Sequence, residues 1–147
     1  MSKLTETKRA YDRLKRLLDE EARQRKGELK DLQRYQEALD VAFYLLGWAQ
    51  FEYLVREESK ETILEKASTK GVEKHAWEYL KASLKEFPVR KRLDLIFHSK
   101  PEIRAKLDAD YTVRNEAAHN YKNLPAEARD VSQWLLKLEE LVDKFEH

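Results

Sequence analysis

Apolar residues recur at intervals of three and four along most of the chain, and this periodicity restricts the fold more than any other feature. Alternation of apolar and polar residues, the mark of a strand, never lasts four residues without helical spacing competing with it. Only three Gly and three Pro occur among 147 residues, so turns must be few. We therefore predict an all-α protein, an up-and-down helical bundle of four to five helices with a long N-terminal helix.

The N-terminal segment is the least apolar of the predicted helices. Residues 3–35 predict one long helix, or two helices joined near Gly27. Its apolar stripe is too thin for a buried core helix, so the segment could arch over the domain, pair with a second copy or fray; a solvated helix with charge pairs is an equal alternative. We divide the chain into an arm, 1–35, and a bundle domain, 36–147. The stripe comprises Leu4, Tyr11, Leu14, Leu18, Leu29 and Leu32.

The middle of the chain predicts a central helix and then an interruption. Residues 36–58 are the most apolar part, and so broad an apolar surface is typical of a helix contacted from several sides. In residues 59–71, polar residues and a glycine predict a loop or a broken helix. The central helix carries Leu39, Ala42, Phe43, Leu46, Ala49, Tyr53 and Leu54 at helical spacing.

Proline and serine mark the boundaries of the later helices. A helix over 72–86, with Trp77, Leu80 and Leu84 facing inward, should end at Phe87-Pro88, because the residue before Pro is pushed out of the helical region. Ser99 can cap the helix that starts near residue 100. After a loop at 120–125, the last helix is amphipathic over 125–146. Its apolar face holds Val131, Trp134, Leu135, Leu138, Leu141, Val142 and Phe145.

One short run combines a guanidinium, an amide, an imidazole and a phenol. Arg114 and His119 are five residues apart, which on a helix is about 500°, so their side chains point roughly 140° apart. One straight helix cannot aim both at one atom: either the helix ends between them or a second copy completes the site. Asn115 shares a face with His119 and could orient its ring. The run is Arg114, Asn115, Glu116, Ala117, Ala118, His119, Asn120 and Tyr121.

This run resembles the signature of the HEPN superfamily: Arg, a polar residue, a short spacer, then His. Tyr121 makes it similar to the variant found in HEPN toxins of toxin–antitoxin pairs, although Asn120 stands where other HEPN groups often have Gly. The resemblance implies a HEPN-like bundle and a metal-independent endoribonuclease, a toxin or defence enzyme that needs no cofactor. It also implies a homodimer whose two motifs line one cleft.

The resemblance further assigns roles to single residues. Arg114 and His119 are the catalytic pair, with Asn115 holding His119 or contacting phosphate. Tyr121 is modified by a cognate antitoxin protein, stacks on a base or simply packs. Glu52, on the central helix, is expected near the Arg/His site, although an exposed surface carboxylate is the alternative. A non-catalytic HEPN adaptor, a nucleotide-binding module and an unrelated helical bundle remain competing interpretations.

Charge and composition limit how RNA and other partners can bind. The net charge is only +1, so RNA contact requires a local patch, and Arg90, Lys91 and Arg92 form the densest positive cluster. We interpret it as a rim for RNA phosphates, with a solvated helix start as the alternative. Arg92 and His98 form a second Arg–His pair, six residues apart across an apolar spacer, which predicts core helix. Cysteine and metal-ligand spacing are absent, and no apolar stretch predicts a leader or membrane span; we expect a cytoplasmic protein.

Overall fold

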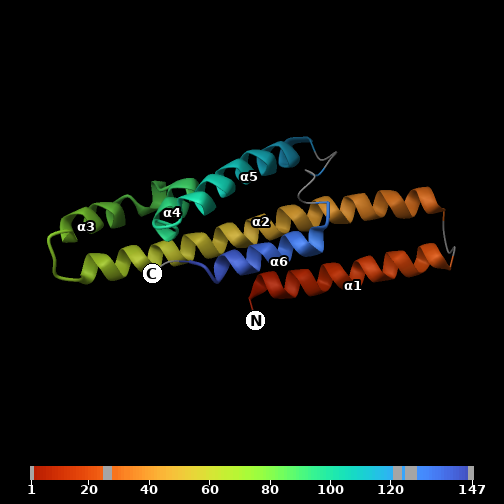
Figure 1. Ribbon diagram of the computed structural model, residues 1–147, viewed down its shortest axis with the longest axis horizontal. Coiled ribbons are helices and arrows are strands. Elements are labelled where there is room, and N and C mark those ends of the chain that lie inside the picture. The colour runs from red at the N-terminus through yellow and green to blue at the C-terminus, as the bar shows by residue number, and fades with distance from the viewer. Residues whose placement is uncertain (1, 25–27, 121–123, 125–128, 146–147) are drawn as a thin grey trace. The chain divides into compact units, whose positions relative to one another are not determined.

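The computed structural model describes residues 2–24, 28–120, 124 and 129–145, and every regular element among them is helical (Figure 1). The predictions of an all-α chain and a long N-terminal helix are confirmed, with six α-helices where four to five were expected. The helices are α1 (Lys3–Arg23), α2 (Leu29–Ser68), α3 (Lys74–Ala82), α4 (Val89–Ile96), α5 (Pro101–Asn120) and α6 (Val131–Val142), and a short 3-10 helix, η1 (Leu84–Glu86), follows α3.

The chain forms two compact units, each assembled from segments far apart in sequence. The first unit comprises Met1–Phe51 and Tyr111–Leu141, and the second comprises Glu52–Asp110 and Val142–His147. The segment predicted as an arm, 1–35, belongs to the first unit. Whether it is a separate structural part stays a prediction.

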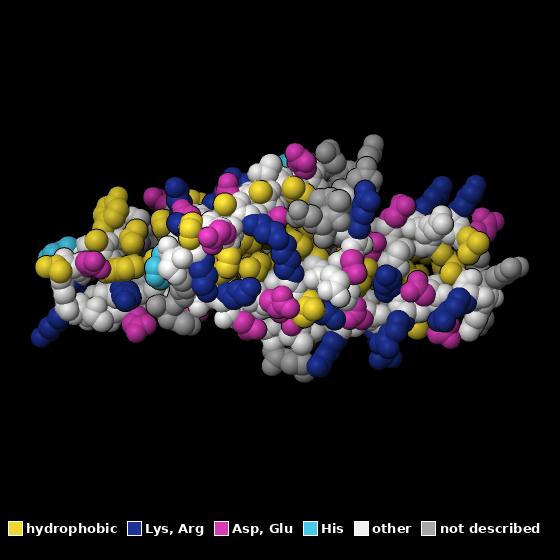
Figure 2. Space-filling model, viewed as in Figure 1, with side chains coloured by type: hydrophobic (Ala, Val, Ile, Leu, Met, Phe, Trp, Pro, Cys, Tyr) yellow, Lys and Arg dark blue, Asp and Glu magenta, His cyan; other side chains and the backbone are white. Residues whose placement is uncertain are grey.

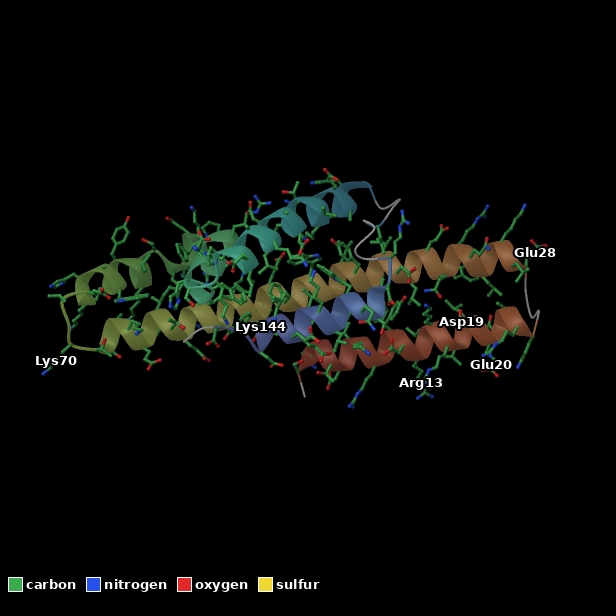
Figure 3. The ribbon with its side chains drawn as sticks, in the orientation of Figure 1. Arg13, Asp19, Glu20, Glu28, Lys70 and Lys144 are labelled. Atoms are coloured by element: carbon green, nitrogen blue, oxygen red, sulfur yellow. The ribbon has the colours of Figure 1, made fainter. Side chains whose placement is uncertain are left out.

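In the first unit, α1 lies beside the beginning of α2 and runs in the opposite direction (Figure 1). Leu4 and Tyr11 are buried, so the expectation that this segment is too weakly apolar to join a core is wrong for its first turns. Farther along, Arg13 and Glu20 extend from the side of α1 turned away from α2 (Figure 3). The helix therefore changes from a core element into a solvated one along its length.

Two part-buried hydrogen bonds join α1 to α2. The Tyr11 hydroxyl donates to Asp40 Oδ1 at 2.6 Å, and Thr7 Oγ1 donates to Gln50 Oε1 at 2.7 Å. Burial raises the pKa of Tyr11, and the Asp40 carboxylate raises that pKa further because it accepts the phenolic proton's hydrogen bond. The phenol therefore stays neutral and keeps donating. These polar bonds hold α1 against α2 in addition to its apolar contacts. The thin apolar stripe in the sequence gives no indication of them.

Aromatic residues of α2 form the centre of the first unit. Trp48 is fully buried, with its ring centroid 4.9 Å from that of Tyr111 on α5 and 5.3 Å from that of Trp134 on α6. Gly47 lets α6 approach closely, because a Cβ atom there would lie 2.5 Å from Leu135 Cδ2. Both α5 and α6 thus contact α2 around Trp48, which confirms the prediction that several elements pack against this helix.

Another face of α2 differs from the prediction. Leu46 and Tyr53 are 42% and 62% exposed, and Ala42 and Ala49 are also exposed. At about 100° per residue, these four lie on the side of the helix opposite the core-facing Tyr44. The apolar pattern is wide because apolar residues lie on two opposite faces of α2. Among the described residues, other helices cover only the face that carries Tyr44.

In the second unit, α2 continues to Ser68, so the predicted loop or broken helix at 59–71 is wrong over most of its length. Ser59 does not interrupt the helix because its hydroxyl finds partners there: it donates to Arg56 O at 3.0 Å and accepts from Arg92 Nη1 at 3.1 Å. Polar residues at this point therefore mark an internal contact instead of a turn.

The predicted break at proline is present in the second unit. Phe87 is extended and Pro88 precedes the first turn of α4, which buries Val89, Leu93 and Ile96. By contrast, α3 has no fully buried residue, although the sequence predicted an inward face of Trp77, Leu80 and Leu84; these three are half-buried. The α3 helix is consequently a more loosely packed element than the sequence suggests.

Candidate functional site

Residues 114–120 of the motif form the last two turns of α5. This helix runs without interruption to Asn120, so Arg114 and His119 occupy one helix and diverge by about 140°. A helix end between them, one of the two arrangements expected from the sequence, is therefore excluded. The other arrangement, in which a second copy of the chain completes the site, stays a prediction.

Arg114 lies on the packed side of α5. Its neighbours Tyr111 and Ala117 are buried, and its own side chain is half-buried. Arg114 Nη1 donates to Asn115 Oδ1 at 3.1 Å. Asn115 thus contacts the arginine in this structure, whereas the sequence analysis placed it against His119 or a phosphate.

His119 lies in the last turn of α5 and is exposed. An exposed imidazole can exchange a proton with a substrate hydroxyl, and this is what a general base requires. Tyr121, predicted to be modified or to stack on a base, lies outside the described residues, so its role stays a prediction.

Glu52 is half-buried on α2 at the beginning of the second unit. The alternative of an exposed surface carboxylate stays a prediction as well. Its expected approach to Arg114 stays a prediction, since Arg114 belongs to the first unit.

The positive cluster on α4 contains two exposed cations and one buried cation. Arg90 and Lys91 are exposed, whereas Arg92 is only 7% exposed. Burial lowers the pKa of Arg92, and the nearby Arg56 charge lowers that pKa further.

The Arg92 guanidinium donates to groups of the protein itself. Its partners are Leu84 O at 2.6 Å, Phe87 O at 2.9 Å, Ser59 Oγ at 3.1 Å and Arg56 O at 3.2 Å. The prediction that Arg92 contacts RNA phosphates is corrected accordingly: it joins α4, η1 and α2, and the exposed rim consists of Arg90 and Lys91.

A groove of about 360 Å³ lies beside Arg90 and Lys91 and also receives Arg104 from α5. Arg90 Nε is 3.4 Å from Asp108 Oδ1, and Arg104 Nη1 is 3.8 Å from Asp94 Oδ1. A phosphate in this groove would have to compete with both carboxylates. Arg104 could not be singled out from the sequence, because one Arg among many charged helical residues gives no signal of its own.

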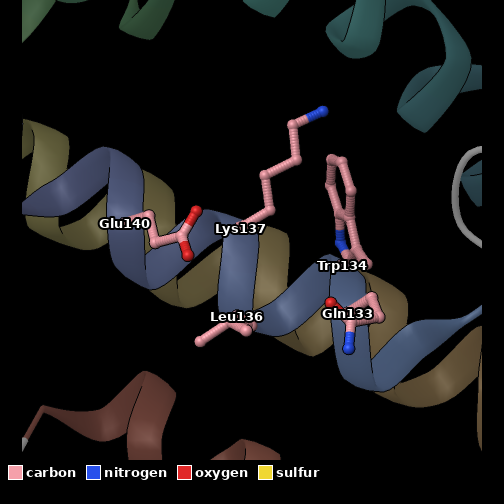
Figure 4. Close-up of a pocket in the computed structure, with 5 residues that line it drawn as sticks. All are labelled: Gln133, Trp134, Leu136, Lys137 and Glu140. Carbon is pink, nitrogen blue, oxygen red and sulfur yellow. The ribbon is translucent and has the colours of Figure 1, made fainter.

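The described part of α6 lines a second hollow, of about 230 Å³. Trp134 and Lys137 extend from the same side of the helix (Figure 4), with Lys137 Nζ 5.6 Å from the centroid of the tryptophan ring. No nucleophile or proton donor of the motif lines it, and we assign it no catalytic role.

The described surface and the comparisons add few constraints. Cationic and anionic side chains are interspersed on the face shown in Figure 2. In residues 2–24, 28–120, 124 and 129–145, no three His, Asp or Glu side chains gather to hold a metal ion. Within these same ranges, no helix combines the length and apolar character needed to cross a bilayer.

No protein-family model, curated protein or solved structure matches the chain.

Proposed function

We propose that the protein is a HEPN-type endoribonuclease that cleaves single-stranded RNA without a metal ion, using Arg114 and His119 from two copies of the chain. The observation that carries the proposal is the exposure of His119 at the end of α5. A histidine sealed in the core against backbone carbonyls would have favoured an adaptor protein. The same proposal includes a HEPN-like bundle and a role as a toxin or defence enzyme.

The reaction needs one base and one cation. His119 removes the proton of a ribose 2′-hydroxyl, and the oxygen attacks the adjacent phosphorus. The bond from phosphorus to the 5′-oxygen breaks, and that oxygen takes up a proton. Arg114 neutralises the charge that builds on the phosphoryl oxygens, which suits its planar fork of donors. The products are a 2′,3′-cyclic phosphate and a 5′-hydroxyl.

The divergence of the two side chains on α5 supports a composite site. Because Arg114 and His119 point about 140° apart on one helix, they face different directions in a single copy of the chain. The proposed homodimer lets Arg114 of one copy act with His119 of the other. Arg90 and Lys91 are the proposed contacts to the RNA backbone beyond the cleavage point.

The first test compares two exposed histidines of the same chain. Wild type, His119→Ala and His98→Ala are incubated with single-stranded RNA in EDTA, and the fragments are examined for cyclic phosphate ends. We expect cleavage by wild type and His98→Ala, and a loss of about 100-fold or more for His119→Ala. Equal cleavage by wild type and His119→Ala would remove His119 as the base. Cleavage by none of the three would favour the non-catalytic adaptor.

The second test asks whether the site is shared between copies. Arg114→Ala and His119→Ala are each inactive under the proposal, but a mixed dimer keeps one intact site, with Arg114 from one chain and His119 from the other. Mixing the two variants should therefore restore cleavage. If the mixture stays as inactive as its components while wild type cleaves, the pair acts within one chain and the composite site is wrong.

A further inference from the structure

Three arginines form an exposed row along α1, in the first unit. Arg9, Arg13 and Arg16 are all exposed, and their spacing of four and three residues places them within about 60° of one another around the helix. Arg13 extends from the side of α1 turned away from α2, and Glu20 follows on that same side (Figure 3). The arginine row therefore runs from Arg9 to Arg16, as a narrow strip of positive charge.

The packing of α1 fixes the direction of this row. The buried residues of the helix, Leu4, Thr7 and Tyr11, lie roughly 180° around the helix from the arginine row. Two of them, Thr7 and Tyr11, also donate hydrogen bonds to α2. The contacts that dock the helix thus hold the arginine row outward, so a ligand would meet cations that are already arranged.

The carboxylates beside the arginine row already pair with lysines. Glu6 Oε2 lies 3.4 Å from Lys3 Nζ, and Asp12 Oδ2 lies 3.0 Å from Lys8 Nζ. Within the part of the chain that the structure describes, no ion pair joins an arginine of the row to a carboxylate. Arg16 Nε donates to the backbone carbonyl of Asp12 at 3.4 Å, which leaves its other donors for a ligand. The arginine row can therefore bind an anion without first breaking an ion pair.

We propose that the arginine row binds the phosphate backbone of single-stranded RNA, one phosphate to each arginine. Along the helix axis the arginines are about 6 and 4.5 Å apart, which is comparable with the separation of neighbouring phosphates on one strand. A guanidinium is always charged, and its planar fork of donors matches phosphate oxygens. In a chain with a net charge of only +1, such a local strip is what attracts a polyanion.

A membrane surface fits the arginine row less well than RNA does. A helix that lies on a bilayer inserts its apolar face, and the apolar face of α1, with Leu4 and Tyr11, is buried within the first unit. The inference rests on RNA as the substrate of the proposed function. It adds a contact on the unit that carries Arg114 and His119, and this contact does not depend on the cleavage chemistry.

The test removes the charge of the arginine row. Arg9→Gln, Arg13→Gln and Arg16→Gln are combined, and binding of a short labelled oligouridylate is measured by fluorescence anisotropy at several salt concentrations. Every protein also carries His119→Ala, so that the RNA stays intact. We expect binding about 10-fold weaker or more at about 0.1 M salt, and a slope of log K against log salt that is shallower by about 2, because each phosphate contact to a single strand contributes about 0.7. Unchanged affinity and slope, with unchanged helical circular dichroism, would overturn the proposal.

Two control variants show whether the position of the charges matters. Lys60→Gln, Lys66→Gln and Lys70→Gln together remove the same charge from exposed positions of the second unit and should leave RNA binding nearly unchanged. Replacing the three arginines of the row with Lys keeps the charge and should keep the salt slope. A lysine control that weakens binding as much as the row variant would show that net charge alone attracts RNA. Tighter binding of anionic phospholipid vesicles than of RNA, lost in the row variant, would assign the row to a membrane instead.

Cleavage by the same proteins without His119→Ala separates this inference from the proposed function. If wild type cleaves RNA and the row variant binds it as well as wild type does, the arginine row is wrong and the nuclease stands. If no protein cleaves but the row variant loses RNA binding, the arginine row stands and the nuclease is wrong.

Discussion

Two arginines of this chain stand five or six residues before a histidine, and their environments differ. Arg92 is 7% exposed and donates to three backbone carbonyls and one serine hydroxyl, all within the second unit. Arg114 is half-buried, and its Nη1 donates to the neighbouring Asn115. The associated histidines, His98 and His119, are both exposed. Spacing alone therefore does not distinguish a structural arginine from a candidate catalytic one.

The difference teaches that the partners of a guanidinium decide its role. A planar fork with five donors satisfies carbonyl groups at the end of a short helix as well as it satisfies a phosphate. At Arg92 the carbonyls of η1 and of the segment before α4 supply the acceptors. Substitutions at the two arginines, at Ser59 and at His98 test this difference in role.

The largest effect is expected for Arg92→Ala. It removes four hydrogen bonds of a buried guanidinium at once, which should lower the free energy of unfolding by about 3 kcal/mol or more. Urea denaturation followed by circular dichroism measures the change. The exposed Arg13, replaced by Ala, is the control and should shift the stability by less than about 0.5 kcal/mol. Equal stabilities for the two variants would contradict the structural role of Arg92.

Arg114→Ala should show the reverse pattern. Under the proposed function it lowers RNA cleavage by about 100-fold, equivalent to about 2.7 kcal/mol of transition-state stabilisation. Its effect on the free energy of unfolding should be smaller than that of Arg92→Ala, because the side chain is half-exposed. Cleavage rates and urea midpoints measured on the same preparations separate the two effects. A variant that unfolds as readily as Arg92→Ala would make Arg114 a structural residue too.

A smaller effect is expected for Ser59→Ala, which removes one acceptor from Arg92 while leaving the carbonyls in place. The loss should be about 1 kcal/mol of unfolding free energy. Because both residues belong to one hydrogen-bonded cluster, the Ser59→Ala and Arg92→Ala effects should not add in the double variant. Additive losses would show that the serine acts independently of the arginine.

The smallest effect is expected for His98→Ala. The ring is exposed, and Nδ1 lies 3.0 Å from the carbonyl of Leu95 within its own turn. The free energy of unfolding should change by about 0.5 kcal/mol or less. RNA cleavage should equal that of wild type, which sets this histidine apart from His119. A clear loss of cleavage would mean that the choice between the two Arg–His pairs was wrong.

Much of the fold could be predicted because helical periodicity and proline placement act locally. The break at Phe87-Pro88 and the buried face of α6 follow directly from residue types. The continuation of α2 through Ser59 could not be predicted, since the hydroxyl's partner comes from α4, 33 residues later. The burial of Arg92 has the same origin, because its acceptors exist only once η1 and α2 are in place.

In the candidate site, too, the geometry fixed by one helix could be predicted, whereas rotamers and contacts between helices could not. Sequence spacing gave the divergence of Arg114 and His119, since an uninterrupted helix fixes that angle. It did not give the contact between Asn115 and Arg114, because one rotamer decides whether the amide turns to the arginine or to the histidine. The position of Arg104 beside α4 could not be predicted, because it depends on how α4 and α5 pack together.

The hydrogen bond between Tyr11 and Asp40 gives the chain a built-in optical probe. Because burial and the carboxylate raise the pKa of Tyr11, folding favours its neutral form, and that contribution to stability is lost as the pH rises from about 10 through the folded-state pKa. In an alkaline titration, the ultraviolet signal of this one phenolate should appear only as α1 detaches. Because the chain has seven tyrosines, the difference in tyrosinate absorbance between wild type and Tyr11→Phe isolates this signal and reports on the docking of the N-terminal helix without any label.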